Sequence, residues 1–545
     1  MPEEYSSQTI EHLGMVSAMF DELGIGKVVD ANIPPDPQRI VSAGQALKAM
    51  VLNGLGFTQR RLYLTPEFFL NKPVEQLIGK GIKAEHLNDD SLGRALDEFQ
   101  AYGINQLFNL IAISSVKALG LSPRTAHDDI TCFHVDGKYN SNHEQSQVEA
   151  SGLVKITKGY SRDSKPALNQ VALELICEHQ AKLPIAMNVL SGNESDKTAF
   201  EKSVQTHASQ LQSLGITCVI KDSAGYTATS LINLQAANQK WIMRVPNNIK
   251  AVKTWMTESA YSQKAEFKPL AEGYTYQTRI DDYAGIPQRW LLIHSQAAYL
   301  KEYEGHQKRL SRASEAEYKA LEALMRLEFG CESDAKAALA RVVKKLEFTQ
   351  VLEVKFKQIQ HHDKAGRPSK TQAPTRVTVQ LELCLASQAF ALQQITWQGS
   401  LFVLGTNELD TNLLNDQMVL SEYKGQQKVE SGFKFLKDPM FLAATIFLKK
   451  IERVMALLMV MTVCLLVYAA LEHRIRQTLD KHQLTLPDQK GKPTKLPTAR
   501  WVFALMSDVH LLSITDLKKV ITLNLKPHVR ALLELLGVGY TSAYP

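Results

Sequence analysis

Residues 423–437 read YKGQQKVESGFKFLK, and the interpretation of the whole chain starts from this segment. If the segment forms one helix at about 100° per residue, its polar side chains gather on one face within about 60°. This face consists of Tyr423, Gln426, Glu430 and Lys437. Val429, Phe433 and Leu436 fall on the adjoining stripe, which predicts that this stripe is buried. A carboxylate held beside cations at such an edge is the setting expected for metal binding and phosphate chemistry.

An amphipathic helix with Glu, Gln and Lys on its wet side is also an ordinary surface helix. The catalytic interpretation therefore requires two further carboxylates to converge on Glu430. Asp222 is one candidate, because it ends the apolar run TCVIKD at 217–222 and so lies at the C-terminal tip of a predicted parallel strand. Ligand and catalytic groups gather at such strand ends in open α/β sheets. An aspartate there is equally a common helix N-cap.

The segment TAHDDITCFHVDG at 125–137 offers three more aspartates, which are Asp128, Asp129 and Asp136. Alternation along a strand sends Asp129 to one face and Asp128 to the other. An aspartate within an otherwise apolar strand is costly unless it is paired or binds a metal. Asp128 and Asp129 are therefore stronger candidates than Asp136, which with Gly137 is typical of a hairpin turn.

The periodicity of apolar residues divides the chain into five regions. Residues 1–120 are predicted to be helical, either as a helix-turn-helix DNA reader or as a plain helical bundle. Strand-like and helix-like segments over 121–247 indicate a mixed sheet whose later connections are parallel. Residues 248–397 interrupt this rhythm and look inserted. Residues 398–480 resume the core, and 481–545 form a C-terminal helical region that is a candidate for dimerisation.

The composition is that of an ordinary globular protein, because 45% of the 545 residues are hydrophobic and 22% are charged. A net charge of +6 permits a polyanionic partner without requiring one. Six scattered cysteines and a polar N-terminus favour a cytoplasmic protein. The uncharged run at 454–471 reaches the length of a membrane span, but its charged flanks favour a buried core helix and no membrane partner.

Taken in order, these features resemble one known family. The order is an Asp-x-Thr strand at 129–131, the strand-end Asp222, an inserted region and a pattern close to Tyr-x2-Arg-x3-Glu-x6-Lys at 423–437. It resembles the DDE transposases of bacterial insertion sequences that carry the Tyr-Arg-Glu-Lys signature. The resemblance covers nearly the whole chain. Segments that look like family blocks are HLNDDSLGRALDEF, GYSRDSKPALNQV, LSGNESDK, LFVLGTN, KGQQKVESGFKFLKDPMF and RWVFALM.

The resemblance implies an α/β fold. Its elements are an RNase H-like mixed sheet flanked by helices, an α+β insertion before the last catalytic helix, and a helical N-terminal domain. It also implies that Asp129, Asp222 and Glu430 are the catalytic residues and bind two Mg²⁺ ions, for which Mn²⁺ can substitute. Asp136 in place of Asp129 stays an alternative.

The resemblance also implies DNA contacts by Tyr423 and Lys437 on the same helix. Gln426 stands where the signature has Arg, and an amide cannot supply the bidentate grip of a guanidinium. Lys434 and its basic neighbours are expected to compensate in part for that difference. Arg367, in the Gly-Arg-Pro segment at 366–368, is either a minor-groove hook or part of a basic hairpin turn.

The implied function is metal-dependent cleavage and strand transfer of DNA at the terminal inverted repeats of an insertion sequence. The expected course is cut-and-paste movement through hairpin ends, with the protein as a homodimer on the bacterial nucleoid. Trp255 and Trp290 are either aromatic supports for a flipped base or ordinary core residues. The competing functions are an RNase H-like nuclease and a domesticated DNA-binding protein without transposition activity.

Overall fold

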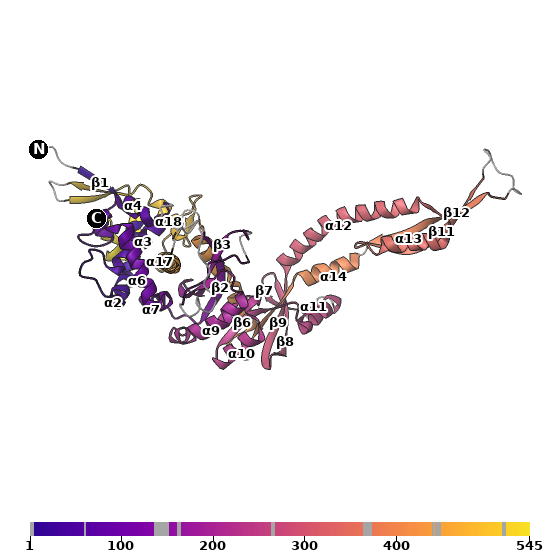
Figure 1. Cartoon of the computed structure of the whole chain (residues 1–545), viewed down its shortest axis with the longest axis horizontal. Coiled ribbons are helices and arrows are strands. Elements are labelled where there is room, and N and C mark those ends of the chain that lie inside the picture. Colours follow the sequence, from indigo (N-terminus) through magenta and orange to yellow (C-terminus); the bar gives the residue numbers. More distant parts are fainter. Residues whose placement is uncertain are drawn as a thin grey trace. The chain divides into compact units, whose positions relative to one another are not determined.

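The computed structural model describes most of the chain as two compact units. The first comprises Met1–Met243, Asp282–Gln288 and Thr406–Pro545, and the second comprises Arg244–Asp281 and Arg289–Gly405. The structure describes residues 5–58, 62–135, 152–160, 165–262, 267–362, 373–387, 389–438, 441, 448, 450–514 and 519–545. Figure 1 shows their helices and strands in sequence colours.

The N-terminal part of the first unit is mainly helical (Figure 1). Its elements are β1 (Tyr5–Thr9), α1 (Leu13–Glu22), α2 (Ile25–Asn32), α3 (Ala43–Leu55), η1 (Leu62–Leu64), α4 (Thr65–Phe69), α5 (Val74–Leu77), η2 (Ala84–Leu87), α6 (Asp89–Tyr102) and α7 (Ile104–Ala118). Local sequence explains several helix starts. The Ser42 side chain accepts from the Gln45 N–H in a capping box, and Asn88 caps α6 by accepting from the Ser91 N–H.

A mixed sheet follows in the same unit. Its elements, with the helices between them, are β2 (Thr125–Val135), β3 (Asn169–Glu178), β4 (Pro184–Ser191), α9 (Asp196–Ser213), β5 (Cys218–Lys221), η3 (Ser223–Gly225), α10 (Ala228–Ala236) and β6 (Lys240–Val245). The strand order is β4-β3-β2-β5-β6. The pairs β4–β3 and β3–β2 are antiparallel, whereas β2–β5 and β5–β6 are parallel. The predicted mixed sheet is thereby confirmed.

The C-terminal part of the first unit returns to the N-terminal helices. Its elements are α15 (Asp416–Lys424), α16 (Gln427–Leu436), α17 (Ile451–Lys481), β14 (Leu486–Pro487), β15 (Pro493–Thr494), α18 (Ala499–Leu505), β16 (His510–Ile514), β17 (Lys519–Leu523), α19 (Pro527–Leu536) and α20 (Val538–Thr541). Strand β1 pairs antiparallel with β16, and β16 with β17. The segment 481–545 therefore contains strands as well as the expected helices.

Helix α17 forms the centre of this unit. It packs against α1, α3, α6, α7, α18 and α19, so one continuous apolar core joins the N-terminal helices to the C-terminal region. By length and composition α17 could span a membrane, but 89% of its most apolar window is buried inside the protein. The prediction of a buried core helix is confirmed.

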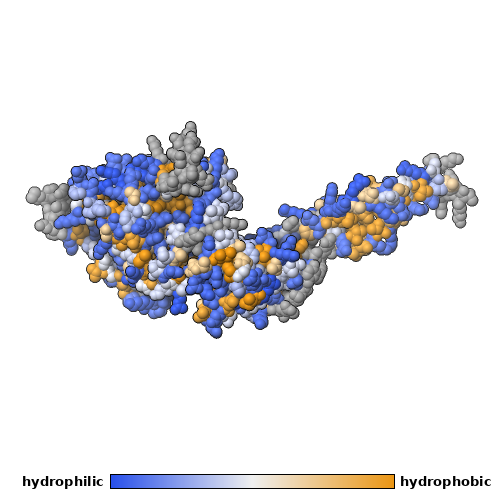
Figure 2. Space-filling model, turned by 60° about the horizontal axis from the view of Figure 1, so that its bottom comes forward, coloured by the Kyte–Doolittle hydropathy of each residue, from blue (hydrophilic) through white to orange (hydrophobic). Residues whose placement is uncertain are grey.

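The visible face in Figure 2 is mostly hydrophilic, with apolar residues in separate patches.

The second unit combines strands and helices. Its elements are α11 (Lys250–Ser262), β7 (Lys268–Ala271), β8 (Tyr274–Tyr283), β9 (Ile286–Ser295), α12 (Gln296–Met325), β10 (Glu328–Phe329), α13 (Glu332–Val343), β11 (Thr349–His361), β12 (Arg376–Ser387), α14 (Ala389–Gly399) and β13 (Leu401–Thr406). Strands pair in the orders β13-β9-β8-β7 and β10-β12-β11. A separate apolar cluster, which includes Leu321, Leu339 and Leu381, joins α12, α13 and β12.

Candidate active site

The two candidate aspartates lie at the same level of two neighbouring parallel strands. In the β2–β5 ladder, Thr125 is opposite Cys218 and His127 is opposite Ile220. The ladder ends at this pair; continued by two residues, its register puts Asp129 opposite Asp222. Neighbouring strands lie about 4.8 Å apart, and residues opposite each other in a parallel ladder point to the same face. The fold therefore brings these two carboxylates to one place at the end of β5.

Each aspartate has a local backbone contact as well. Asp222 is the N-cap of η3, and its Oδ1 accepts from the Ala224 N–H at 3.0 Å. The Oδ1 of Asp129 accepts from the Ile130 N–H at 2.8 Å. Both side chains are half-buried. The capping interpretation of Asp222 is thus correct, and a cap that uses one oxygen leaves the carboxylate's other lone pairs for a further ligand.

Helices α15 and α16 pack against the face of the sheet to which Asp129 belongs. Thr125 Oγ1 donates to Glu422 Oε2 at 2.8 Å. An added Cβ at Gly425 would lie 2.9 Å from the His127 ring, so the helical segment touches β2 there with no room for a side chain. Thr125, His127 and Asp129 alternate onto one face. The helical segment thus advances along β2 toward Asp129, and α16 itself packs against that strand.

Glu430 lies in the first turn of α16, and its side chain is exposed. Among the described residues, no group of three His, Cys, Asp or Glu side chains is arranged to hold a metal ion. The continued β2–β5 register aligns Asp129 with Asp222, and α16 packs against β2, but the three carboxylates do not form a metal-binding cluster among the described residues.

The predicted single helix over 423–437 is wrong in detail, because the structure has two helices. Helix α15 ends at Lys424 and α16 begins at Gln427, although Gly425 and Gln426 keep right-handed helical dihedral angles. The Gln426 N–H donates to the Tyr423 carbonyl, which tightens the turn at the junction. The close approach of Gly425 to His127 is the packing feature that accompanies this junction.

The candidate DNA contacts spread over this junction. Tyr423 is in α15, and Gln426 is the N-cap of α16 without a side-chain capping bond; both are half-buried. Lys434 is exposed on α16, and Lys437, its half-buried C-cap residue, follows the helix. Arg367 and Asp136 lie outside the described residues.

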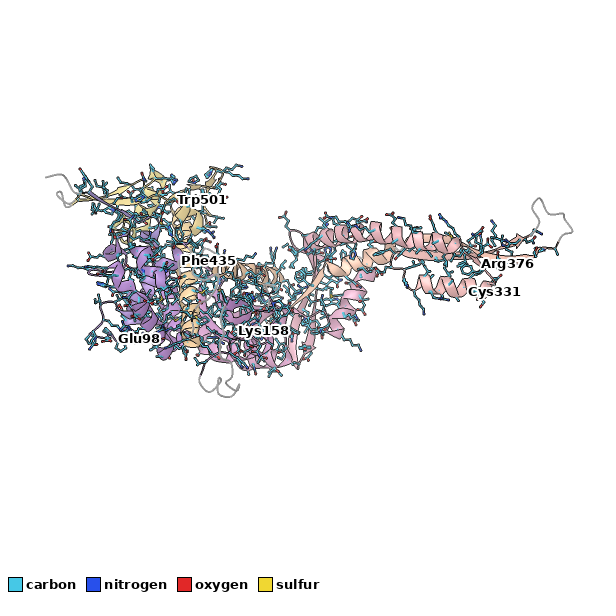
Figure 3. All side chains as sticks on the ribbon, turned by 45° about the horizontal axis from the view of Figure 1, so that its top comes forward. Glu98, Lys158, Cys331, Arg376, Phe435 and Trp501 are labelled. Atoms are coloured by element: carbon cyan, nitrogen blue, oxygen red, sulfur yellow. The ribbon has the colours of Figure 1, made fainter. Side chains whose placement is uncertain are left out.

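A pocket of about 430 Å³ lies beside α16 in the first unit. Lys434, Arg476 and Arg500 contribute cationic side chains to its lining, and Arg476 and Arg500 form ion pairs there with Glu472 and Asp438. Phe435 and Tyr468 contribute aromatic rings whose centroids are 4.5 Å apart. Figure 3 shows Phe435 on this unit. The pocket beside α16 thus combines charged side chains with two adjacent aromatic rings.

The opposite face of β2 carries a buried ionic group that the sequence argument did not identify. Lys221 Nζ lies 2.9 Å from Asp128 Oδ2 and 3.8 Å from Glu174 Oε1. Burial, followed by the charge of Asp128, raises the pKa of Glu174 well above its usual value. The sequence feature that indicates this ionic group is a charged residue, Lys221 or Glu174, inside an otherwise apolar strand.

Trp255 and Trp290, for which the sequence leaves a base-supporting role and a core role open, are core residues of the second unit. Trp290 is 1% exposed and Trp255 is 8% exposed. The Arg279 guanidinium lies 4.3 Å from the Trp255 ring centroid and 5.3 Å from that of Trp290. The Trp255 indole N–H also donates to Gln277. These contacts favour the structural role.

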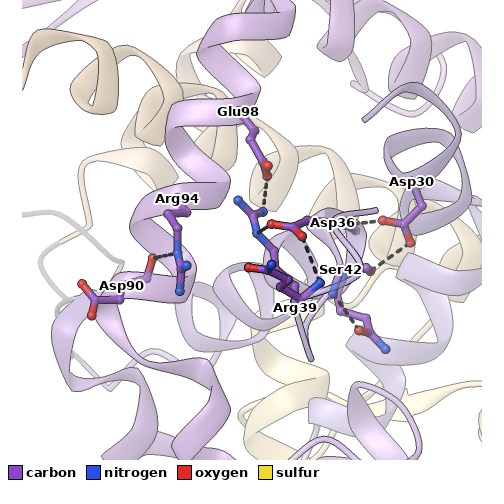
Figure 4. A network of polar contacts seen from close by, with 10 residues as sticks. Asp30, Asp36, Arg39, Ser42, Asp90, Arg94 and Glu98 are labelled. Atoms are coloured by element: carbon purple, nitrogen blue, oxygen red, sulfur yellow. Dashed lines mark hydrogen bonds and ion pairs between the residues drawn. The ribbon is translucent and has the colours of Figure 1, made fainter. Parts of the chain in front are cut away.

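Two arginines of the N-terminal region, Arg39 in the loop between α2 and α3 and Arg94 on α6, take part in internal polar contacts (Figure 4). Arg39 donates to Glu98 at 2.6 Å, and Arg94 donates to the Asp90 carbonyl on its own helix. Arg60 and Arg61 lie outside the described residues. The expected boundary at residue 120 falls inside the first unit, so the N-terminal helices share its core.

Comparisons with known proteins add the following findings. Residues 5–113 match the model of a family described as a domain of unknown function, DUF4277. No curated protein matches the chain. Among solved structures, the chain is similar to the piggyBac transposase in a synaptic complex with hairpin DNA, determined by cryo-electron microscopy. The identity is 9% and the TM-score is 0.36, over 92% of this chain and 82% of that one.

Proposed function

We propose that this protein is a DDE-type DNA transposase with an RNase H-like catalytic core. In this proposal it cleaves DNA at the terminal inverted repeats of an insertion sequence and joins the freed ends to target DNA. The observation that supports the proposal is the β2–β5 register, which, continued two residues beyond its last pair, would bring Asp129 opposite Asp222 at the end of a parallel strand pair. Ligand and catalytic groups are concentrated at such strand ends.

The sheet supports the same proposal. Three consecutive antiparallel strands are followed by two strands that run parallel to the first, in the order β4-β3-β2-β5-β6. In sequence terms this order is 3-2-1-4-5, the arrangement expected of an RNase H-like sheet. A helical segment then returns to β2 and carries Glu430. The catalytic residues of the proposal thus come from the first strand, the fourth strand and the returning helix.

The donor set fits hard divalent cations, because Asp129 and Asp222 offer neighbouring carboxylate oxygens that are half-buried. Asp129, Asp222 and Glu430 would hold Mg²⁺, or Mn²⁺ in its place. When bound, two such ions lower the pKa of an attacking water and stabilise the leaving oxygen of the phosphodiester. Joint binding requires the exposed Glu430 to approach the two aspartates more closely than it does here.

The other residues of the site act on the DNA. Lys434 and Lys437 supply ammonium groups for backbone phosphates beside the carboxylates. Tyr423 offers a hydroxyl, and Gln426 offers an amide that cannot replace the bidentate contact of Arg. Arg367 is proposed as a further DNA contact. In the full proposal, the protein moves the element by cut-and-paste through hairpin ends. It acts as a homodimer in the synaptic complex, on the bacterial nucleoid.

The test uses purified protein and a duplex made from the DNA that flanks its coding sequence. With Mg²⁺ we expect nicked or hairpinned ends, and with Glu430→Ala we expect none. Equal cleavage by Glu430→Ala and the unmodified protein would rule out the proposed active site. Cleavage without joining of the freed 3′ ends would instead favour an RNase H-like nuclease, and DNA binding without cleavage a domesticated DNA-binding protein.

A further inference from the structure

The Asp128–Lys221 ion pair links the two strands on which the candidate catalytic aspartates lie. The two side chains are 1% and 3% exposed, and Lys221 Nζ lies 2.9 Å from Asp128 Oδ2. Asp128 directly precedes Asp129, and Lys221 directly precedes Asp222. The pair therefore lies on the face of the sheet opposite the two catalytic candidates.

The environment of the pair is closed. The Phe200 ring of α9 lies under the ammonium group, with its centroid 4.1 Å from Lys221 Nζ. Ser203 and His207 of α9 are each 1% exposed, and Glu174 completes the polar group from β3. Lys221 Nζ is closer to Asp128 Oδ2, at 2.9 Å, than to Glu174 Oε1, at 3.8 Å, so Asp128 is its direct ion-pair partner.

Stability alone gives a weak reason for such a pair. Removing two charges from water costs about as much as their attraction returns, and an apolar pair of similar size is often as stable. Geometry gives a stronger reason. The backbone ladder between β2 and β5 ends at the level of His127 and Ile220. The Asp128–Lys221 contact is one residue beyond it, and the catalytic candidates are one residue beyond that contact.

We propose that Asp128 and Lys221 are positioning residues, whose buried ion pair fixes the separation of the Asp129 and Asp222 carboxylates. The inference rests on the proposed function, because it assigns these two carboxylates to metal binding. Neither Asp128 nor Lys221 touches DNA or metal. Their effect passes through the strand backbone to the next residue on each strand, where small displacements change how well two oxygen donors fit one cation.

The decisive variant is the double change Asp128→Asn with Lys221→Met. Each single change leaves one buried group unpaired and lowers stability, whereas the double change removes both charges together. The readouts are Mn²⁺ affinity, from the electron paramagnetic resonance of free Mn²⁺, and nicking of the flanking-DNA duplex. Urea unfolding midpoints identify variants that have merely lost the fold.

We expect the double variant to unfold near the midpoint of the unmodified protein, yet to bind Mn²⁺ about 10-fold or more weakly and to nick correspondingly slowly. The matched control removes the Lys48–Asp21 ion pair, whose Nζ–Oδ2 distance is 2.7 Å, by Lys48→Met with Asp21→Asn. This control should keep the Mn²⁺ affinity unchanged.

Unchanged Mn²⁺ affinity and nicking in the Asp128→Asn/Lys221→Met protein would overturn the positioning role and leave the proposed function intact. A different pattern identifies failure of the proposed function. In that case the unmodified protein would bind Mn²⁺ no better than its Asp129→Asn variant and would not nick the duplex, and the positioning role would be overturned with it.

Discussion

Asp128 and Asp129 are adjacent in sequence but have opposite environments. Asp128 is 1% exposed and pairs with Lys221 under α9. Asp129 is half-buried and lies on the face against which α15 and α16 pack. The alternation of a β-strand produces this difference without any change in residue type. One carboxylate is suited to hold strands together, and its neighbour is suited to bind a ligand.

The largest expected effect separates the two aspartates by activity. Asp129→Asn keeps the size of the side chain but replaces a carboxylate oxygen donor by an amide. We expect DNA cleavage to fall by more than about 100-fold, because changes even beyond the direct ligands of a metal cost 10- to 100-fold. Gel analysis of duplex cleavage in Mg²⁺ measures this. A cleavage rate within a few-fold of that of the unmodified protein would show that Asp129 is not part of the active site.

The second prediction compares the free energies of unfolding of variants at Asp128 and Asp129. Asp128→Asn leaves the Lys221 ammonium buried without its carboxylate, which we expect to cost about 3 kcal/mol in the free energy of unfolding. Removing one partner of a buried ion pair costs about 3–5 kcal/mol. We expect the low end of this range because Glu174, 3.8 Å from Lys221, can ionise in place of Asp128. Asp129→Asn should cost about 1 kcal/mol or less. Urea unfolding compares them, and equal losses would contradict the contrast.

A third prediction concerns how the stability of the first unit, which contains both aspartates, depends on pH through the buried His12 of the N-terminal region. His12 is buried, stacks on Phe503 and bonds the Leu55 carbonyl, and burial lowers its pKa to about 4. The unfolded chain therefore binds a proton at higher pH than the folded protein does. Stability should be fully present above pH 6.5 and should fall by about 3 kcal/mol as the pH decreases to about 4.

Urea unfolding followed by the fluorescence of the buried tryptophans measures this loss. His12→Gln removes the titrating group and should flatten the dependence between these pH values. An unchanged slope in His12→Gln would assign the acid sensitivity to other groups of the unit.

The smallest expected effect concerns the helical segment on the Asp129 face. Gly425→Ala would place a Cβ 2.9 Å from the His127 ring and 2.9 Å from the Glu422 carbonyl oxygen. We expect a loss of about 1–3 kcal/mol from overpacking, with a drop in cleavage if α16 shifts away from β2. Gly305→Ala, where an added Cβ meets nothing within 4 Å, is the matched control in α12. Equal stability of both variants would show that the junction has room.

Local sequence patterns predicted much of the fold and the strand positions of the candidate aspartates. The strand predicted within 125–137 is β2, and the apolar run at 454–471 forms the buried core of α17. Strand periodicity and capping depend on neighbours in sequence, which explains why these predictions were correct. The continuous helix over 423–437 was wrong because periodicity does not report the contact between Gly425 and His127.

The sequence by itself identified the candidate residues for chemistry and predicted to which face of a strand each one points. Alternation separated Asp128 from Asp129, and position at a strand end singled out Asp222. Only the tertiary structure decided that Asp222 lies opposite Asp129, that Lys221 neutralises Asp128, and that the N-terminal helices share a core with α17. The physical reason is that register and burial arise between segments far apart in the chain, whose pairing local periodicity does not specify.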